Sequence, residues 1–318
     1  MYHRTVLAVT DFSAASANAA WRAALIATEH SAHLHLLHVV STGKAPVARG
    51  SRTPIDTQLE DVRLHLKAVA RRLRIELGAD VSWRVVRGDP VWESVQASHN
   101  AHLLVIGSAR RNALRQSLMG TAVERLIRMA CIPVLVVKRG AERAYRKLLV
   151  PVDLAPHAEA AVSAALDFSR GAEVEVFHAL RVLDGIGIPA ADAPEAALRG
   201  CRNTAMDKAR AALLAIIRAA GGTARARPAL EFGHPPGTSL RQEVLMAPEL
   251  VVIGKRDRSL LADFFLGSVT QRLLAEASSD LLILPVTAKA SAAVVIARPS
   301  TPLQRSFWNW NSRISRGD

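Results

Sequence analysis

The sequence predicts an α/β protein built from two tandem domains, each a doubly wound parallel sheet of five strands. Two observations lead to this prediction. The chain contains an internal repeat, and each copy of the repeat alternates short apolar runs with longer segments of helical periodicity. A length of 318 residues, of which 50% are hydrophobic and 22% are charged, suits two folded domains of ordinary size.

The repeat is clearest in two strings that align without a gap at an offset of 147 residues. HLLVIGSARRNALRQSLMGTAVERLI covers residues 102–127, and ELVVIGKRDRSLLADFFLGSVTQRLL covers residues 249–274. RTVLAVTDFSAAS likewise pairs with RKLLVPVDLAPHA, and VVRGDPVWESV pairs with LEFGHPPGTSL. We therefore predict a first domain over residues 1–140 (copy one), a second over 146–286 (copy two), and a basic flexible tail over 287–318.

The first half of copy one predicts the order strand, helix, strand, helix. Val6–Val9 is a short apolar run, and Ser13 can cap a helix that continues to about His30. His33–Val40 predicts the second strand. Asp56–Leu77 predicts a helix, because its apolar residues recur at spacings of three and four. These are Leu59, Val62, Leu66, Val69, Leu73 and Leu77.

The second half of copy one adds three strands and two helices. Val81–Val86 predicts the third strand, and a short helix follows Pro90. Leu103–Ile106 predicts the fourth strand, Met119–Met129 a helix, and Pro133–Val137 the fifth strand. Copy two repeats this order. Apolar strands joined by helices indicate a parallel sheet covered on both faces, with ligands at the carboxyl ends of the strands.

The cysteine count and the hydropathy exclude several classes of protein. The two cysteines, Cys131 and Cys201, cannot form a disulfide-rich scaffold or a four-cysteine zinc site. No apolar run reaches the roughly 18 residues that a membrane helix needs. We therefore expect a cytoplasmic protein with no membrane partner.

The net charge of +13 is distributed unevenly along the chain. Residues 1–143 carry a net +9, residues 144–286 are neutral, and residues 287–318 carry +4. A polyanion could bind the basic first half. The alternative is a solvated, arginine-rich surface, and the neutral second half favours that alternative.

Histidines cluster near the second predicted strand, at His30, His33, His35 and His38. His33 and His35 share one strand face, because side chains on a strand repeat every two residues. Two imidazoles could begin a metal site, but no Cys or carboxylate within the strand completes it. We therefore predict no metal site, and no catalytic residue is assigned, since neither a G-x-S-x-G nor a G-x4-G-K-[S/T] motif is present.

A glycine-bearing loop after the fourth strand of each copy is the most specific local signal. Gly107 ends a strand and Gly120-Thr121 opens a helix, and Gly254 and Gly267-Ser268 repeat this arrangement. A helix N-terminus offers unpaired N–H groups to a phosphate, a glycine lets the phosphate approach, and a hydroxyl adds a donor. The structural alternative is that these glycines only shape turns.

A carboxylate ends the first strand of each copy, at Asp11 and Asp153. In this position it could accept a hydrogen bond from a nucleobase amine or a ribose hydroxyl. The alternative for Asp11 is a role in capping the helix that begins beside Ser13.

These features together resemble the universal stress protein family in its tandem two-domain form. The resemblance covers nearly all of residues 1–286 and rests on VLAVTDFSAAS, on the RGDP turn, and on the paired VIG…GT and VIG…GS loops. It implies an adenine nucleotide alpha hydrolase-like fold. It also implies an intramolecular pseudo-dimer, because single-domain members commonly pair through their last strands. Here those strands are Pro133–Val137 and Leu281–Leu284, joined by the junction Arg139–Tyr145.

The resemblance also assigns a nucleotide site to each copy. In copy one it gives the adenine and ribose to Asp11 and Val39, and the phosphates to Gly107, Gly120 and Thr121. In copy two the matching residues are Asp153, Ala179, Gly254, Gly267 and Ser268. The nucleotide would be ATP with magnesium.

The sequence departs from the family's nucleotide-binding pattern, G-x2-G-x9-G-[S/T], at one position in both copies. Arg110 and Asp257 replace the second glycine, while the spacing is intact. Both add bulk, and Asp257 adds a charge that repels phosphate. Copy one is therefore the favoured nucleotide site.

Three functions follow from these observations. The first is a non-enzymatic stress-response protein that acts through regulated binding to a protein partner, with ATP as an effector in copy one. The second is a slowly ATP-hydrolysing switch, and the third is a polyanion-binding protein. Pairing of the two domains within one chain does not exclude a homo-oligomer formed by several copies of the whole chain. Trp308 and Trp310 in the tail could dock on the body or on a partner.

Overall fold

The computed structural model describes residues 4–41, 55–108, 121–155, 157–181, 195–254 and 266–285. The predicted tail, with Trp308 and Trp310, lies outside these residues, as do Gly120, Arg110 and Asp257. Copy one contains β1 (Thr5–Val9), α1 (Ala14–Glu29), β2 (His33–Ser41), α2 (Ile55–Leu77), β3 (Val81–Gly88), α3 (Pro90–Ser98), β4 (Leu103–Gly107), α4 (Ala122–Met129) and β5 (Val134–Val137).

Copy two repeats the same succession of elements. It contains β6 (Lys147–Pro151), α5 (Ala158–Phe168), β7 (Glu173–Leu180), α6 (Glu195–Ala219), β8 (Ala226–Phe232), α7 (Pro235–Met246), β9 (Leu250–Gly254), α8 (Ser268–Glu276) and β10 (Asp280–Leu284). The predicted α/β class is confirmed. The main difference is in the helix predicted from Met119, of which the described part begins at Ala122 with Thr121 as its N-cap.

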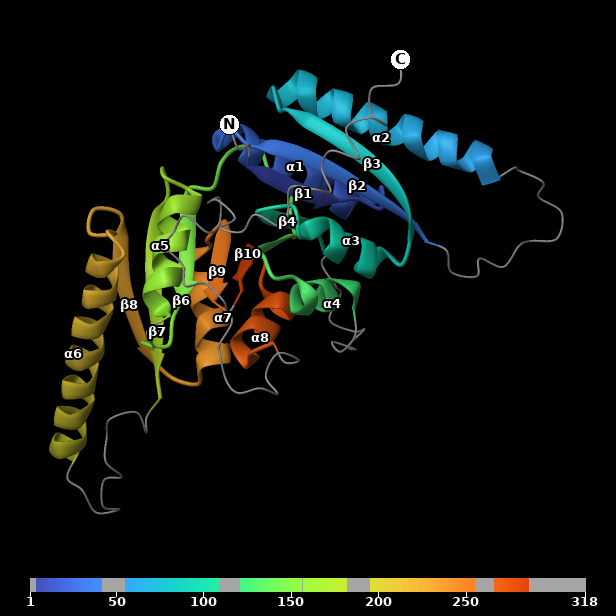
Figure 1. The fold of residues 1–318 in the computed structure, drawn as a ribbon. Coiled ribbons are helices and arrows are strands. Elements are labelled where there is room, and N and C mark those ends of the chain that lie inside the picture. Colours follow the sequence, from blue (N-terminus) through green and yellow to red (C-terminus); the bar gives the residue numbers. More distant parts are fainter. Residues whose placement is uncertain are drawn as a thin grey trace.

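All ten strands join one sheet in the order β3-β2-β1-β4-β5-β10-β9-β6-β7-β8 (Figure 1). Strands within each copy are parallel, as predicted for apolar strands joined by helices. The copies meet through β5 and β10, which pair antiparallel with Leu135 opposite Leu282. The predicted pairing of the fifth strands is therefore confirmed, and it leaves no apolar edge at the centre of the described sheet.

Helices cover both faces of the sheet, and each face has its own hydrophobic core (Figure 1). One core packs α1, α2, α5 and α6 against alternate strand residues such as Val6 and Val105. The other packs α3, α4, α7 and α8 against the intervening residues such as Leu7 and Leu104. Alternation at a period of two thus sends neighbouring strand residues into opposite cores. Among the helices in the described ranges, none combines the length and the apolar composition that a membrane crossing needs.

Candidate functional site

A pocket of about 370 Å³ opens in copy two at the carboxyl ends of β6, β7 and β9. This volume lies within the range of about 300–1,000 Å³ that is typical of small-molecule sites. Its position is the one at which parallel sheets bind ligands. All five residues predicted for copy two line it, namely Asp153, Ala179, Gly254, Gly267 and Ser268.

The charged side chains and the histidines of the pocket follow or end β6 and β7. Asp153 Oδ1 accepts a hydrogen bond from the Ala155 N–H at 3.2 Å and lies 3.3 Å from His157 Nε2. His178 Nδ1 lies 2.8 Å from the Val152 carbonyl oxygen, which orients the imidazole at the wall. Arg181, directly after β7, adds a guanidinium to the lining. Among these described lining residues, Asp153 therefore supplies the one carboxylate, and it shares the pocket with the Arg181 guanidinium and with neutral polar groups.

The N-terminus of α8 faces the same pocket and has no side-chain cap. Gly267 is the N-cap residue, and it can make no side-chain hydrogen bond to the helix. The first turn of α8 also contains no acidic residue. Because the first N–H groups of a helix have no intrahelical partners and carry the positive end of its dipole, this end can accept an anion.

The corresponding helix end in copy one is capped by its own residues. The Thr121 hydroxyl accepts a hydrogen bond from the Glu124 N–H at 3.2 Å. Glu124 places an acidic side chain in the first turn of α4, 3.3 Å from Arg128. The predicted phosphate residue Thr121 thus satisfies a backbone donor of its own helix.

Asp11, the carboxylate predicted for copy one, is likewise held by local hydrogen bonds. Its Oδ1 accepts from the Ser13 N–H at 3.0 Å. Burial alone would raise the pKa of the Asp11 carboxyl, but hydrogen bonds from Ser13 and Ser16 together bring the pKa below its ordinary value. Asp11 thus accepts the N–H of Ser13, the N-cap residue of α1, just as Asp153 accepts the N–H of Ala155 in copy two. Val39 lies on β2, nearly buried, in the core beneath α3 and α4.

The two strand-end glycines differ in what surrounds them. A Cβ atom on Gly107 would overlap the Ala15 carbonyl group, so the first turn of α1 presses directly on this glycine. A Cβ on Gly254 would meet nothing closer than 3.9 Å, at Ala161 and His157. Gly107 is thus a packing glycine, whereas Gly254 lines the pocket and could carry a Cβ without overlap.

This difference follows from the helix caps. Ser13 accepts a hydrogen bond from the Ser16 N–H at 3.2 Å, and α1 begins at Ala14. Ala155 occupies the equivalent place in copy two and has no side-chain acceptor, so the described part of α5 begins only at Ala158. The later start leaves room beside Gly254.

Sequence reasoning missed several lining residues, including His157, Arg181, Ser239 and Thr270. Arg181 directly follows a predicted strand, so the rule that ligands sit at carboxyl ends could have found it. Ser239 and Thr270 come from α7 and α8, and no motif marks them.

The clustered histidines lie within hydrogen-bond distance of hydroxyl and carbonyl oxygens of the fold. His33 Nε2 and His35 Nδ1 lie 2.6 Å and 2.8 Å from the Ser82 hydroxyl oxygen, which confirms that both share one strand face. His38 Nδ1 lies 2.8 Å from the Thr10 carbonyl oxygen, and His30 Nε2 is 2.9 Å from that of Phe168. Among the described residues, no group of three or more His, Cys, Asp or Glu side chains could hold a metal ion.

Comparison with known proteins places the whole body of the chain in one family. The model of the universal stress protein family matches residues 1–138 and again residues 144–285. Universal stress protein Rv2005c of Mycobacterium tuberculosis is 27% identical over 301 residues, which cover 88% of this chain and 96% of that protein. Universal stress protein MJ0531 of Methanocaldococcus jannaschii is 29% identical over 141 residues, 43% of this chain and 83% of its own.

A solved structure shares the tandem fold. The crystal structure of a universal stress protein from Archaeoglobus fulgidus is similar with a TM-score of 0.61 at 18% identity. The match covers 88% of this chain and 96% of the other.

Proposed function

Because the chain belongs to the universal stress protein family in its tandem two-domain form, we propose that it acts in stress response by binding an adenine nucleotide, with no chemical conversion of it. The nucleotide is an effector, and its binding site is the pocket of copy two. The observation that supports this proposal is the convergence of Asp153, the open glycine Gly254 and the uncapped N-terminus of α8 on one pocket.

The described lining residues fit such a ligand. The phosphates would lie at the N–H groups of Gly267 and Ser268, where the dipole of α8 is positive. The Asp153 carboxylate would accept a hydrogen bond from the ribose or the base, and Ala179 leaves space beside it. Bound ATP would bring several negative charges and, with them, magnesium. Arg181 would partly balance these charges.

Sequence and geometry favour different copies for this role. The sequence favours copy one, because Asp257 stands in the copy-two loop where the family pattern has glycine. The geometry of the described residues favours copy two, because Thr121 caps α4 with its own hydroxyl while α8 has no side-chain cap. Among the described residues, a Cβ would fit at Gly254, which lines the pocket, but would overlap Ala15 at Gly107, and this difference decides our choice of copy two.

Substituting Gly267→Val is expected to weaken ATP binding about tenfold or more, which corresponds to loss of about 1.4 kcal/mol or more of binding free energy. A Cβ atom here meets no described atom within 4 Å, so the variant should fold normally while its isopropyl group occupies the phosphate position. The matched variant Gly120→Val places the same side chain at the equivalent position of copy one and should leave the affinity unchanged. Isothermal titration with ATP and magnesium measures both.

The opposite pattern, with loss only in Gly120→Val, would assign the nucleotide to copy one. A phosphate-release assay on the same samples tests the non-enzymatic part of the proposal. Release that requires the protein and disappears in the variant that no longer binds ATP would contradict it and identify a slowly hydrolysing switch.

A further inference from the structure

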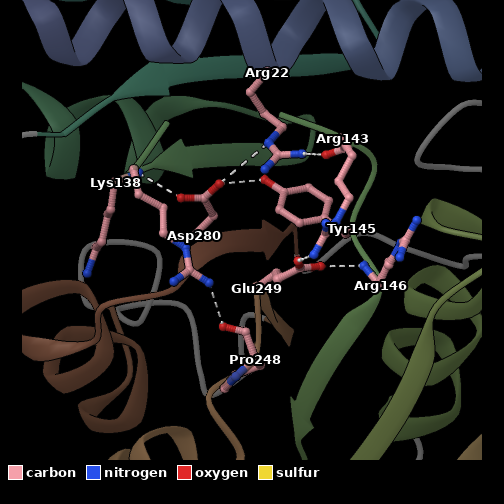
Figure 2. Close-up of polar contacts among 9 residues, drawn as sticks. Arg22, Lys138, Arg143, Tyr145, Arg146, Pro248, Glu249 and Asp280 are labelled. Carbon is pink, nitrogen blue, oxygen red and sulfur yellow. Dashed lines mark hydrogen bonds and ion pairs between the residues drawn. The ribbon is translucent and has the colours of Figure 1, made fainter. Parts of the chain in front are cut away.

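A cluster of polar side chains is buried where the two copies meet, at one end of the β5–β10 pair (Figure 2). Arg22 from α1, Tyr145 from the junction and Asp280 from β10 are only 5%, 3% and 0% exposed. Buried ionic groups are costly unless they are paired and hydrogen-bonded. The contacts of this cluster therefore determine whether the interface is stable.

Asp280 is the common partner in the cluster. Its Oδ1 accepts the Lys138 backbone N–H at 2.8 Å, and its Oδ2 accepts the Tyr145 hydroxyl at 2.7 Å (Figure 2). Arg22 Nε lies 3.7 Å from the same Oδ2. The Arg22 guanidinium also stacks on the Tyr145 ring, 3.8 Å from its centroid, and donates to the Arg143 carbonyl oxygen at 2.7 Å.

Within the described residues, the cluster occurs at one end of the strand pair and is not repeated at the other. The repeat places Pro133 of copy one where copy two has Asp280, and Ala164 of copy two where copy one has Arg22. Pro285 occupies the place of Lys138 and has no N–H to donate. The acid thus comes only from copy two, and its partners come only from copy one and the junction.

We infer that this one-ended cluster makes β5 and β10 selective for each other, so that the two copies of one chain pair in preference to like strands of two chains. Both strands are short apolar edges that would otherwise accept a like strand from another molecule. Selection against such partners requires an unfavourable element in the wrong pairs as well as a favourable one in the right pair.

Pairing of β10 with β10 of a second chain would deprive two carboxylates of their copy-one partners, the Lys138 N–H and the Arg22 guanidinium. In the observed register Leu282 lies at the centre, so Asp280 would face Leu284 and the neighbouring Pro285 of the other chain. Burial raises the pKa of Asp280 above its ordinary value, although the Lys138 N–H, Tyr145 and Arg22 each lower it. Without the Lys138 N–H and Arg22 the carboxyl would either take up a proton or remain charged and buried, and both outcomes disfavour the pair.

Pairing of β5 with β5 of a second chain would have the opposite defect. Pro133 would stand where Asp280 stands, so each Arg22 guanidinium would lose its carboxylate partner. Tyr145 would stay with Asp280, because it packs against Phe168 and Ser169 of copy two. Arg22, on α1, could not reach water without moving, because it is only 5% exposed. A β10–β10 pair would therefore bury carboxyl groups without their cationic partner, and a β5–β5 pair would bury guanidinium groups without their carboxylate partner.

Disulfide reporters at the centre of the strand pair test this inference. In a Cys131→Ser, Cys201→Ser background, which removes both exposed native thiols, Leu282→Cys reports β10–β10 pairing and Leu135→Cys reports β5–β5 pairing. Residues directly opposite in an antiparallel pair lie about 4.5–5.5 Å apart at Cα, within disulfide range. Neither reporter should form interchain dimers in otherwise unchanged protein.

The expected result is a crossed pattern. Asp280→Asn keeps the size and an acceptor oxygen of the side chain, and should raise the β10–β10 disulfide dimer about tenfold without raising the β5–β5 disulfide dimer. Arg22→Leu should raise only the β5–β5 disulfide dimer. Arg128→Leu breaks a mostly buried ion pair with Glu124 inside α4, which takes no part in the cluster, and should change neither.

Non-reducing electrophoresis quantifies the dimers. A rise of both reporters in both variants would show that the cluster only holds the two halves together, and it would overturn the inference. No rise in either variant would overturn it equally, since the charges would then have no influence on which strands pair.

Discussion

Substituting Gly107→Ala is expected to lower the free energy of unfolding by about 3 kcal/mol, the upper part of the range for overpacking a rigid site. The added Cβ would overlap the Ala15 carbonyl group and lie 2.7 Å from the Ser16 backbone nitrogen. All of these atoms are backbone, so no side-chain rotation can relieve the overlap. Either α1 must shift away from β4, or the strand must bend, and both disturb the core beneath α1.

Gly254→Ala is the matched control at the equivalent position of copy two. Its Cβ would meet only Ala161 and His157 at 3.9 Å, an ordinary van der Waals distance. The free energy of unfolding should therefore change by less than about 0.5 kcal/mol. Urea denaturation of the parent and both variants measures the difference. Equal losses in the two variants would show that α1 and α5 press on their glycines alike, contrary to the structure.

Acidification is expected to remove about 3 kcal/mol of stability through His35, because burial, followed by His33 and Arg84, lowers the pKa of this imidazole to about 4. The unfolded chain takes up a proton at an ordinary pKa of 6.5, whereas the folded chain does so only near 4. Between these values the unfolded state binds more protons. The contribution is therefore complete above pH 6.5 and is lost as the pH falls through 4.

The variant His35→Gln isolates this contribution from those of other groups. Glutamine keeps a polar group near the Ser82 hydroxyl, 2.8 Å from His35 Nδ1, and does not titrate. Burial also lowers the pKa values of His30 and His102, so the parent protein has further acid sensitivity of the same sign. Urea denaturation at about pH 7 and about pH 4 should show a smaller loss for the variant than for the parent. Identical losses would mean that His35 is not the group that titrates.

Much of the architecture is local information and could be predicted from the sequence. Apolar runs identified the strands of copy one and periodicity identified α2, because burial of a whole strand or of one helix face leaves a pattern of apolar residues. Ser13 and Pro90 marked the starts of α1 and α3. The repeat then supplied copy two. The pairing of Pro133–Val137 with Leu281–Leu284 could also be predicted, because two short apolar edges in one chain are more stable when they cover each other.

The residues predicted for copy two, from Asp153 to Ser268, line one pocket because the carboxyl ends of parallel strands meet at one edge of a sheet. The family resemblance and the spacing of its glycine motif were sufficient to name them. They were not sufficient to show which copy has the more open site, since the loop residues Arg110 and Asp257 favoured copy one. The space at each site depends on whether the first helix of that copy, α1 or α5, begins close to the strand-end glycine, Gly107 or Gly254.

The fold class and the repeat could be predicted from the amino-acid sequence, because both rest on the order of apolar and polar residues along the chain. The strands that join the copies could be predicted with the help of the family resemblance. The folded structure was needed to show that a Cβ would overlap α1 at Gly107 but would fit at Gly254. The start of the helix sets what it touches, and that start differs because Ser13 can cap a helix and Ala155 cannot. The folded structure was also needed to show that Arg22 and Asp280, on separate copies, share one buried cluster. No local pattern marks such a pair, because the two residues meet only after both sheets have formed and joined.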